Sequence, residues 1–145
     1  MKLGRLNHIG VATPSIADSV AYYRDTMGAT RIGEPFDLPE QGVKVCFVDT
    51  PGHDGTEGTQ IELIEPLGEQ STLTTFMEKN PLGGQHHACY EVPDITAARE
   101  WFEGKGKRIL GPTRIGAHGT PIFFLHPKDM MGQLTEIMET PKEAH

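Results

Sequence analysis

The stretch LNHIGVATPSI at residues 6–16 recurs in altered form as GGQHHACYEVPDI at residues 83–95. When His8 is set over His87, the two stretches stay aligned, and the proline and isoleucine that follow each histidine fall in step. Polar and apolar residues alternate in the first part of both stretches, which is typical of a half-buried strand. One small chain therefore contains the same strand-and-helix opening twice, each time with a histidine near its start.

Elements of the same type follow each opening in the same order. In the first copy, Ile16, Val20, Tyr23 and Met27 lie at helical spacing, and Ser15 begins a capping-box pattern. In the second copy, residues 94–106 predict a helix with Asp94 as its cap. Strand-like runs then follow at residues 29–36, 42–50 and 59–65 in the first copy, and at residues 107–115, 120–127 and 132–139 in the second. Each half is therefore predicted to be βαβββ, in the α+β class.

The two copies predict one domain over residues 1–145, with a first module at about 3–66 and a second at about 83–140. The segment 67–82 between them is predicted to be a linker that contains a short helix at 71–79. We expect the two modules to be related by a pseudo-twofold repeat. Four-stranded sheets joined edge to edge would lose their exposed edges and form a curved eight-stranded cleft.

Composition excludes several classes of protein. The chain has 145 residues, of which 37% are hydrophobic and 23% charged, so disorder is not expected. A net charge of −7 and a pI near 5.4 argue against a nucleic-acid surface. No apolar run reaches the length of a membrane span and no signal-peptide pattern is present, so we expect a cytoplasmic protein. The isolated cysteines Cys46 and Cys89 are expected to be reduced thiols.

Strand alternation selects four residues for the expected cleft. His8 and His87 lie out of phase with the apolar residues that would pack on the helices, and so do Glu62 and Glu136 on the last strand of each module. Two imidazoles and two carboxylates suit a divalent ion such as Co²⁺, Ni²⁺, Mn²⁺ or Zn²⁺. A single strand histidine is more often structural, so the prediction depends on the matched placement of all four. The other five histidines, at positions 53, 86, 118, 126 and 145, have no partner in this pattern.

The duplicated plan and these four residues resemble the vicinal oxygen chelate superfamily, which includes glyoxalase I. Within it the chain is similar to the methylmalonyl-CoA epimerase branch over nearly its whole length. The motifs that carry this resemblance are LNHIGVATP, LPEQGVKVCFVD, IELIEPLG, GGQHHACYEV, GAHGTPIFFLHPKD and GQLTEI. The combination of PEQGV, GGxHH and FLHPKD is specific to that branch.

The resemblance implies a metal-dependent epimerase that interconverts (2R)- and (2S)-methylmalonyl-CoA by 1,1-proton transfer through a metal-stabilised enolate. It implies His8, Glu62, His87 and Glu136 as ligands of one divalent ion, with Co²⁺ as the first choice, and Glu136 and Glu62 as catalytic residues. The substrate would be an acyl-CoA, the partners would include neither nucleic acid nor membrane, and the expected assembly is a homodimer.

One position departs from the family pattern. Many members carry a glutamate base where this chain has Val45, and tend to have Gln where it has Glu62. The second base is therefore predicted to be Glu62 itself. The alternative is that Glu62 is only a metal ligand and that another residue or a water carries the second proton. Three alternatives stay open on the sequence alone: a glyoxalase I-type lactoylglutathione lyase, a metal-free small-molecule binding protein of the same fold, and a mononuclear oxygenase of the superfamily.

Overall fold

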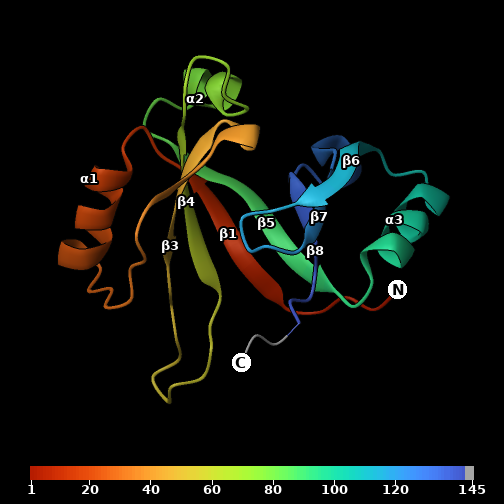
Figure 1. Ribbon diagram of the computed structural model, residues 1–145, viewed down its shortest axis with the longest axis horizontal. Helices are drawn as coiled ribbons and strands as arrows, with labels where there is room; N and C mark the ends of the chain where they lie inside the picture. Colours follow the sequence, from red (N-terminus) through yellow and green to blue (C-terminus); the bar gives the residue numbers. More distant parts are fainter. Residues whose placement is uncertain (143–145) are drawn as a thin grey trace. The chain divides into compact units, whose positions relative to one another are not determined.

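A computed structural model of the chain describes residues 1–142 and divides them into two compact units (Figure 1). One unit is His8–His86; the other joins Met1–Asn7 to the residues from His87 onward. Each unit has a four-stranded sheet with one helix packed on it, in the order βαβββ. The predicted α+β class and the repeated βαβββ plan are confirmed.

The unit His8–His86 has the strand order β2-β3-β4-β1, in which β1 and β4 are parallel and the other neighbours antiparallel. Helix α1 covers one face of this sheet, where Ile16, Cys46, Val48 and Leu63 form a buried cluster. The predicted short helix after the sheet is present as α2. The elements are β1 (Leu6–Ala12), α1 (Ile16–Ala21), β2 (Phe36–Leu38), β3 (Val43–Val48), β4 (Gln60–Pro66) and α2 (Thr74–Lys79).

The other unit repeats this arrangement, with the strand order β5-β8-β7-β6 and β5 parallel to β8. Phe102 and Ala98 of α3 pack on Val92, Phe123 and Ile137 of the sheet. These core residues alternate along each strand with residues of the opposite face, as the half-buried pattern predicts. The elements are β5 (Gly84–Val92), α3 (Ile95–Gly104), β6 (Ile109–Ile115), β7 (Pro121–Leu125) and β8 (Thr135–Glu139).

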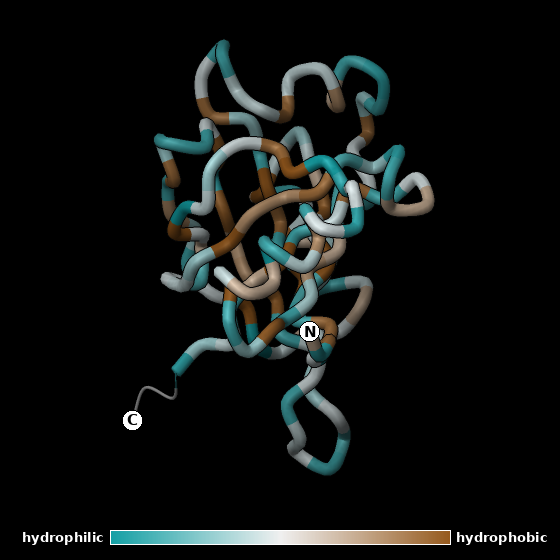
Figure 2. Tube along the Cα trace, turned by 90° about the vertical axis from the view of Figure 1, so that its right-hand side faces the viewer, coloured by the Kyte–Doolittle hydropathy of each residue, from teal (hydrophilic) through white to brown (hydrophobic). Residues whose placement is uncertain are grey.

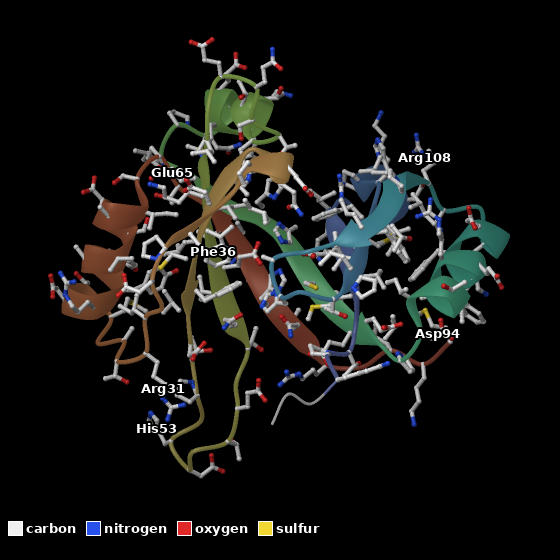
Figure 3. All side chains as sticks on the ribbon, in the orientation of Figure 1. Arg31, Phe36, His53, Glu65, Asp94 and Arg108 are labelled. Atoms are coloured by element: carbon white, nitrogen blue, oxygen red, sulfur yellow. The ribbon has the colours of Figure 1, made fainter. Side chains whose placement is uncertain are left out.

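Both main helices begin in the same way. The side chains of Ser15 and Asp94 each accept a hydrogen bond, at 3.1 Å, from the backbone N–H of the residue three positions later in the chain. Both predicted caps are therefore confirmed. A carboxylate from the last strand of the same unit accepts a second N–H: Ile16 donates to Glu65 and Ile95 donates to Glu139. Figure 3 labels Glu65 in one unit and Asp94 in the other. The carboxylates fix each helix to its sheet and complement the positive helix N-terminus.

Two sequence predictions of local structure are wrong in detail. The run 29–36 is not a continuous strand: Ile32 makes a single bridge to Val48, and β2 starts only at Phe36. Helix α1 ends at Ala21 and continues as a π-helical turn over Tyr22–Thr26. The wider turn changes the angular phase of the residues that follow. As a result Met27, which the sequence places at helical spacing with Ile16, is 60% exposed.

A glycine-rich turn at residues 51–58 joins β3 to β4 and lies at the bottom of Figures 1 and 2. Figure 2 shows it as largely hydrophilic. Both cysteines are buried and unbridged, as expected, and burial raises the pKa of the Cys46 thiol. Among residues 1–142, no helix is long and apolar enough to cross a membrane.

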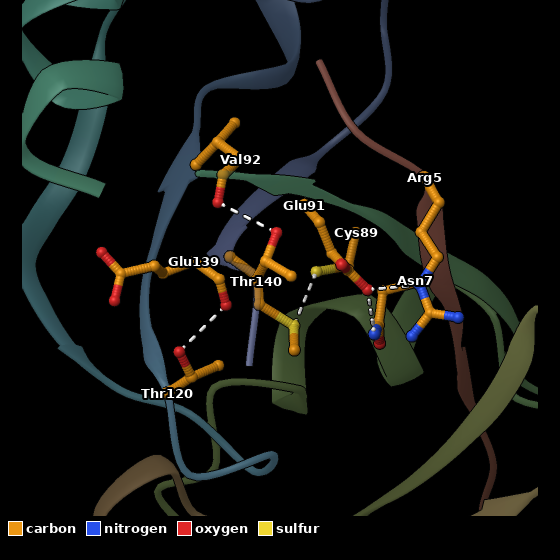
Figure 4. A network of polar contacts seen from close by, with 9 residues as sticks. Arg5, Asn7, Cys89, Glu91, Val92, Thr120, Glu139 and Thr140 are labelled. Carbon is orange, nitrogen blue, oxygen red and sulfur yellow. Dashed lines mark hydrogen bonds and ion pairs between the residues drawn. The ribbon is translucent and has the colours of Figure 1, made fainter. Parts of the chain in front are cut away.

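A buried carboxylate holds the N-terminal segment on β5 (Figure 4). Glu91 Oε2 accepts hydrogen bonds from Arg5 Nε at 2.7 Å and from Asn7 Nδ2 at 2.8 Å. The backbone adds two bonds, from Gly4 N to Glu91 O and from Glu91 N to Arg5 O. Glu91 is only 3% exposed, and a buried carboxylate is tolerated when such donors surround it.

Glu91→Ala is expected to lower the free energy of unfolding by about 2–3 kcal/mol, because it removes a charged acceptor that serves two side-chain donors. Denaturant unfolding monitored by far-UV circular dichroism measures the change. Glu100→Ala is the matched control, since Glu100 lies exposed on α3. Equal stability of the two variants would show that the Glu91 contacts contribute nothing.

Candidate active site

In the unit His8–His86, the structure brings His8 and Glu62 together. The parallel pairing of β1 with β4 sets Gly10 opposite Glu62, and His8 precedes Gly10 by two residues on the same face. His8 Nε2 lies 3.3 Å from Glu62 Oε2. The His8 side chain is fully buried and that of Glu62 is 9% exposed. Two polar side chains are thus held in contact on the face of the sheet that α1 does not cover.

The other unit brings His87 and Glu136 together through the same register. The parallel pairing of β5 with β8 sets Cys89 opposite Glu136, and His87 again precedes the paired residue by two positions. His87 Nε2 lies 3.1 Å from Glu136 Oε1, and both side chains are buried. The ring of Phe124 packs edge-on against the His87 imidazole, with centroids 5.4 Å apart, and so limits its rotation.

The chemistry of these pairs is that of a metal or acid–base site. Burying a carboxylate costs free energy unless a cation or hydrogen-bond donors compensate for it. An imidazole nitrogen beside a carboxylate oxygen can meet that need by donating a hydrogen bond, or both atoms can bind a divalent cation. Each unit therefore supplies one nitrogen and one carboxylate donor suited to such an ion, and each carboxylate can also take up a proton.

Val45 shares a face of its sheet with Glu62. Val45 pairs with Ile64 on β4 and with Phe36 on β2, and directly opposed residues of antiparallel strands point to the same side. The Val45 side chain is fully buried, and Figure 3 labels its partner Phe36. The equivalent residue of the other unit is Ile122, which pairs with Met138. At this position both units carry an aliphatic residue that cannot transfer a proton.

The histidines outside the pattern have other surroundings. The His86 ring packs edge-on against Phe76 of α2. His126 Nδ1 accepts the N–H of Lys128 and caps a short 3₁₀ turn over Pro127–Asp129. His53 lies exposed in the turn between β3 and β4, and His118 lies in the turn between β6 and β7. His145 lies outside the described residues.

Several residues near the two pairs did not follow from alternation alone. Phe47 pairs with Glu62 and Phe124 pairs with Glu136, so a phenylalanine lies beside each carboxylate. The helix-binding carboxylates Glu65 and Glu139 lie three residues after Glu62 and Glu136. Two glutamates three residues apart occur on the last strand of each copy, and this repeated spacing was a signal that could have identified Glu65 and Glu139.

Comparison with known proteins gives the class of protein to which this chain belongs. A family model described as the Glyoxalase/Bleomycin resistance protein/Dioxygenase superfamily matches residues 7–124. The ethylmalonyl-CoA/methylmalonyl-CoA epimerase of Cereibacter sphaeroides is 50% identical over 93% of this chain and 97% of that protein. The mitochondrial methylmalonyl-CoA epimerase of Mus musculus is 46% identical over 94% of this chain and 73% of that protein.

A solved structure agrees with these relatives. Streptomyces coelicolor methylmalonyl-CoA epimerase, in a variant form in complex with 2-nitronate-propionyl-CoA, superposes with a TM-score of 0.86. It is 33% identical, and the match covers 97% of this chain and 100% of that chain. The chain therefore belongs to the methylmalonyl-CoA epimerase family within this superfamily. The resemblance stated from the sequence motifs is confirmed, and so is the prediction of an enzyme.

Proposed function

We propose that this chain interconverts the two C2 stereoisomers of methylmalonyl-CoA by removing the C2 proton and returning a proton to the opposite face. The observation that carries the proposal is the matched pair of buried His–Glu contacts, His8–Glu62 and His87–Glu136. Membership of the epimerase family supports the choice of reaction, and the printed names of the relatives support an acyl-CoA thioester as substrate.

The proposal includes one divalent ion held by His8, Glu62, His87 and Glu136. The donor set fits, because each imidazole nitrogen lies within 3.3 Å of a carboxylate oxygen and all four side chains are largely buried. When bound, the ion would supply positive charge that offsets the negative charge the substrate gains on losing its C2 proton. Co²⁺ is our first choice for this set, with Ni²⁺, Mn²⁺ and Zn²⁺ as alternatives.

The protein's own part is to move protons at C2. Inversion of one carbon needs a base for each face, each within hydrogen-bond reach of the C2 proton on its side. We assign these roles to the carboxylates of Glu136 and Glu62. Val45 has no titratable group, so the assignment of Glu62 follows from the lack of a carboxylate at that position. The homodimer implied by the family resemblance and the cytoplasmic location expected from the sequence pattern stay predictions.

The purified protein is expected to bind about one divalent ion per chain, and both His8→Ala and His87→Ala should lose most of it, because each removes a nitrogen ligand. Elemental analysis after dialysis measures the content. The affinity should fall on acidification, since each imidazole must be unprotonated to bind.

His53→Ala is the matched control for these variants, because His53 lies exposed in a turn and its loss should leave the metal content unchanged. Full metal occupancy in both His8→Ala and His87→Ala would show that the ion, if bound, has other ligands.

Incubation with methylmalonyl-CoA in D₂O is expected to place deuterium at C2 and to interconvert the two stereoisomers. A chelator should abolish both processes, and the added ion should restore them. Proton NMR follows the loss of the C2 hydrogen, and a stereospecific coupled assay follows the interconversion. Turnover of a glutathione hemithioacetal without any deuterium at C2 of methylmalonyl-CoA would favour the glyoxalase I-type activity instead.

Glu62→Gln is expected to retain the ion and to lower epimerisation by about 10²–10⁴-fold. The amide oxygen can still bind a cation, but the side chain can no longer accept the proton. One stereoisomer should continue to exchange its C2 hydrogen through Glu136. Adding Val45→Glu to this variant should restore part of the rate by providing a carboxylate on the same face of the sheet.

Glu69→Gln makes the same chemical change at an exposed position and should leave the rate unchanged. If Glu62→Gln epimerises as fast as the unmodified protein, the second proton is carried by another group.

A further inference from the structure

Two sulfur atoms are in contact on the face of the β5-β8-β7-β6 sheet that α3 does not cover. The Cys89 thiol donates to Met138 Sδ at 3.8 Å, and Figure 4 draws this contact as a dashed line from Cys89. Strand pairing places both residues there, because Cys89 lies opposite Glu136 and Met138 follows Glu136 by two residues on the same face. Both sulfur-containing side chains are fully buried, and the proposed reaction uses neither of them.

The distance between these two sulfur atoms fits a shared metal ion. Two sulfur ligands of one tetrahedral ion, each about 2.3 Å from the metal, lie about 3.8 Å apart. A cysteine thiolate together with a methionine thioether is a soft donor pair, and such donors select Cu⁺. A thioether contributes little to the binding of the harder divalent ions considered above. The donor types therefore indicate a different class of ion from the one that the His–Glu pairs suit.

The surroundings of the sulfur pair favour a monovalent ion. Ile122 belongs to the same buried cluster as Cys89 and Met138, and Phe124 packs against that cluster. A thiolate and Cu⁺ together carry no net charge, so apolar side chains can enclose them without an uncompensated charge. On binding, a sulfur–copper bond would replace the S–H bond and the thiol proton would leave to the solvent, with no transfer of electrons.

We propose that Cys89 and Met138 form a site for the soft monovalent cation Cu⁺, separate from the proposed divalent-ion site, and that its occupation inhibits the proposed reaction. The two sites are neighbours, because a carboxylate oxygen of Glu136 lies within 4.8 Å of Cys89 Sγ. A cation at the sulfur pair would attract this carboxylate and oppose its uptake of a proton. The inhibition rests on the proposed function, whereas the binding of Cu⁺ does not.

Anaerobic titration of the purified protein with Cu⁺, in competition with the chromogenic chelator bathocuproine disulfonate, measures the binding. The unmodified protein is expected to bind about one Cu⁺ per chain and to gain an ultraviolet thiolate-to-copper absorption band. Cys89→Ser should lose both, and Met138→Leu should weaken binding by about tenfold or more, because it removes a sulfur donor at nearly constant volume. Cys46→Ser is the matched control and should retain both, because Cys46 is also buried but its thiol donates to the backbone oxygen of Gly33.

His87→Ala separates the sulfur pair from the proposed divalent-ion site. This variant should keep the copper band, and its loss there would assign Cu⁺ to the divalent-ion site and overturn the inference. Absence of binding by the unmodified protein, or full binding by Cys89→Ser, also overturns it. If Cys89→Ser does not fold, an unchanged affinity in Met138→Leu has the same consequence.

Deuterium exchange at C2 of methylmalonyl-CoA tests the inhibition, with each variant compared with its own rate without copper. One equivalent of Cu⁺ should slow exchange by about tenfold or more in the unmodified protein and in Cys46→Ser, but not in Cys89→Ser. Equal inhibition of all three proteins would refute the inhibitory role of the sulfur pair. If the unmodified protein shows no exchange even without copper, the proposed function is wrong, and the binding measurements still decide whether the copper site exists.

Discussion

The parallel pairing of the first and last strands within each unit is the constraint on which the candidate site depends. In β1–β4 and in β5–β8 the glutamate lies opposite the residue two positions after the histidine. A slip of one residue would turn either glutamate to the helix-covered face, where Leu63 and Ile137 are buried. The same register brings Glu65 and Glu139 to the helix N-termini, so helix attachment and the His–Glu contacts require the same alignment.

This register explains which parts of the site could be predicted from sequence. Alternation along a strand is a local property, so the faces of His8 and His87, and the caps Ser15 and Asp94, could be predicted from a few neighbouring residues. The pairing of β1 with β4 joins segments some fifty residues apart and has no local signal, so the sequence did not predict it. The π-helical turn after Ala21 was not predicted, because a 3.6-residue period assumes an uninterrupted α-helix.

The two units resemble each other more closely in structure than in sequence. The residues beside the two carboxylates correspond: Phe47 with Phe124, and Val45 with Ile122, each in the same register with its glutamate strand. The resemblance stated from the sequence motifs implies that many members of the family carry a glutamate at the position of Val45, which would break that symmetry. Here the two units keep aliphatic residues at this position and carboxylates next to the imidazoles. The ionisable groups of the two units are therefore of the same kind and in the same local setting.

Such likeness suits a reaction that inverts one carbon. Substrate and product differ only at C2, so the base for one direction is the acid for the other. In the proposed reaction Glu62 and Glu136, each paired with a buried imidazole at 3.1–3.3 Å, would take these two roles in turn. Duplication of one βαβββ unit supplies both carboxylates with the same strand register, so the proposed reaction has a candidate second base in Glu62 although Val45 cannot transfer a proton.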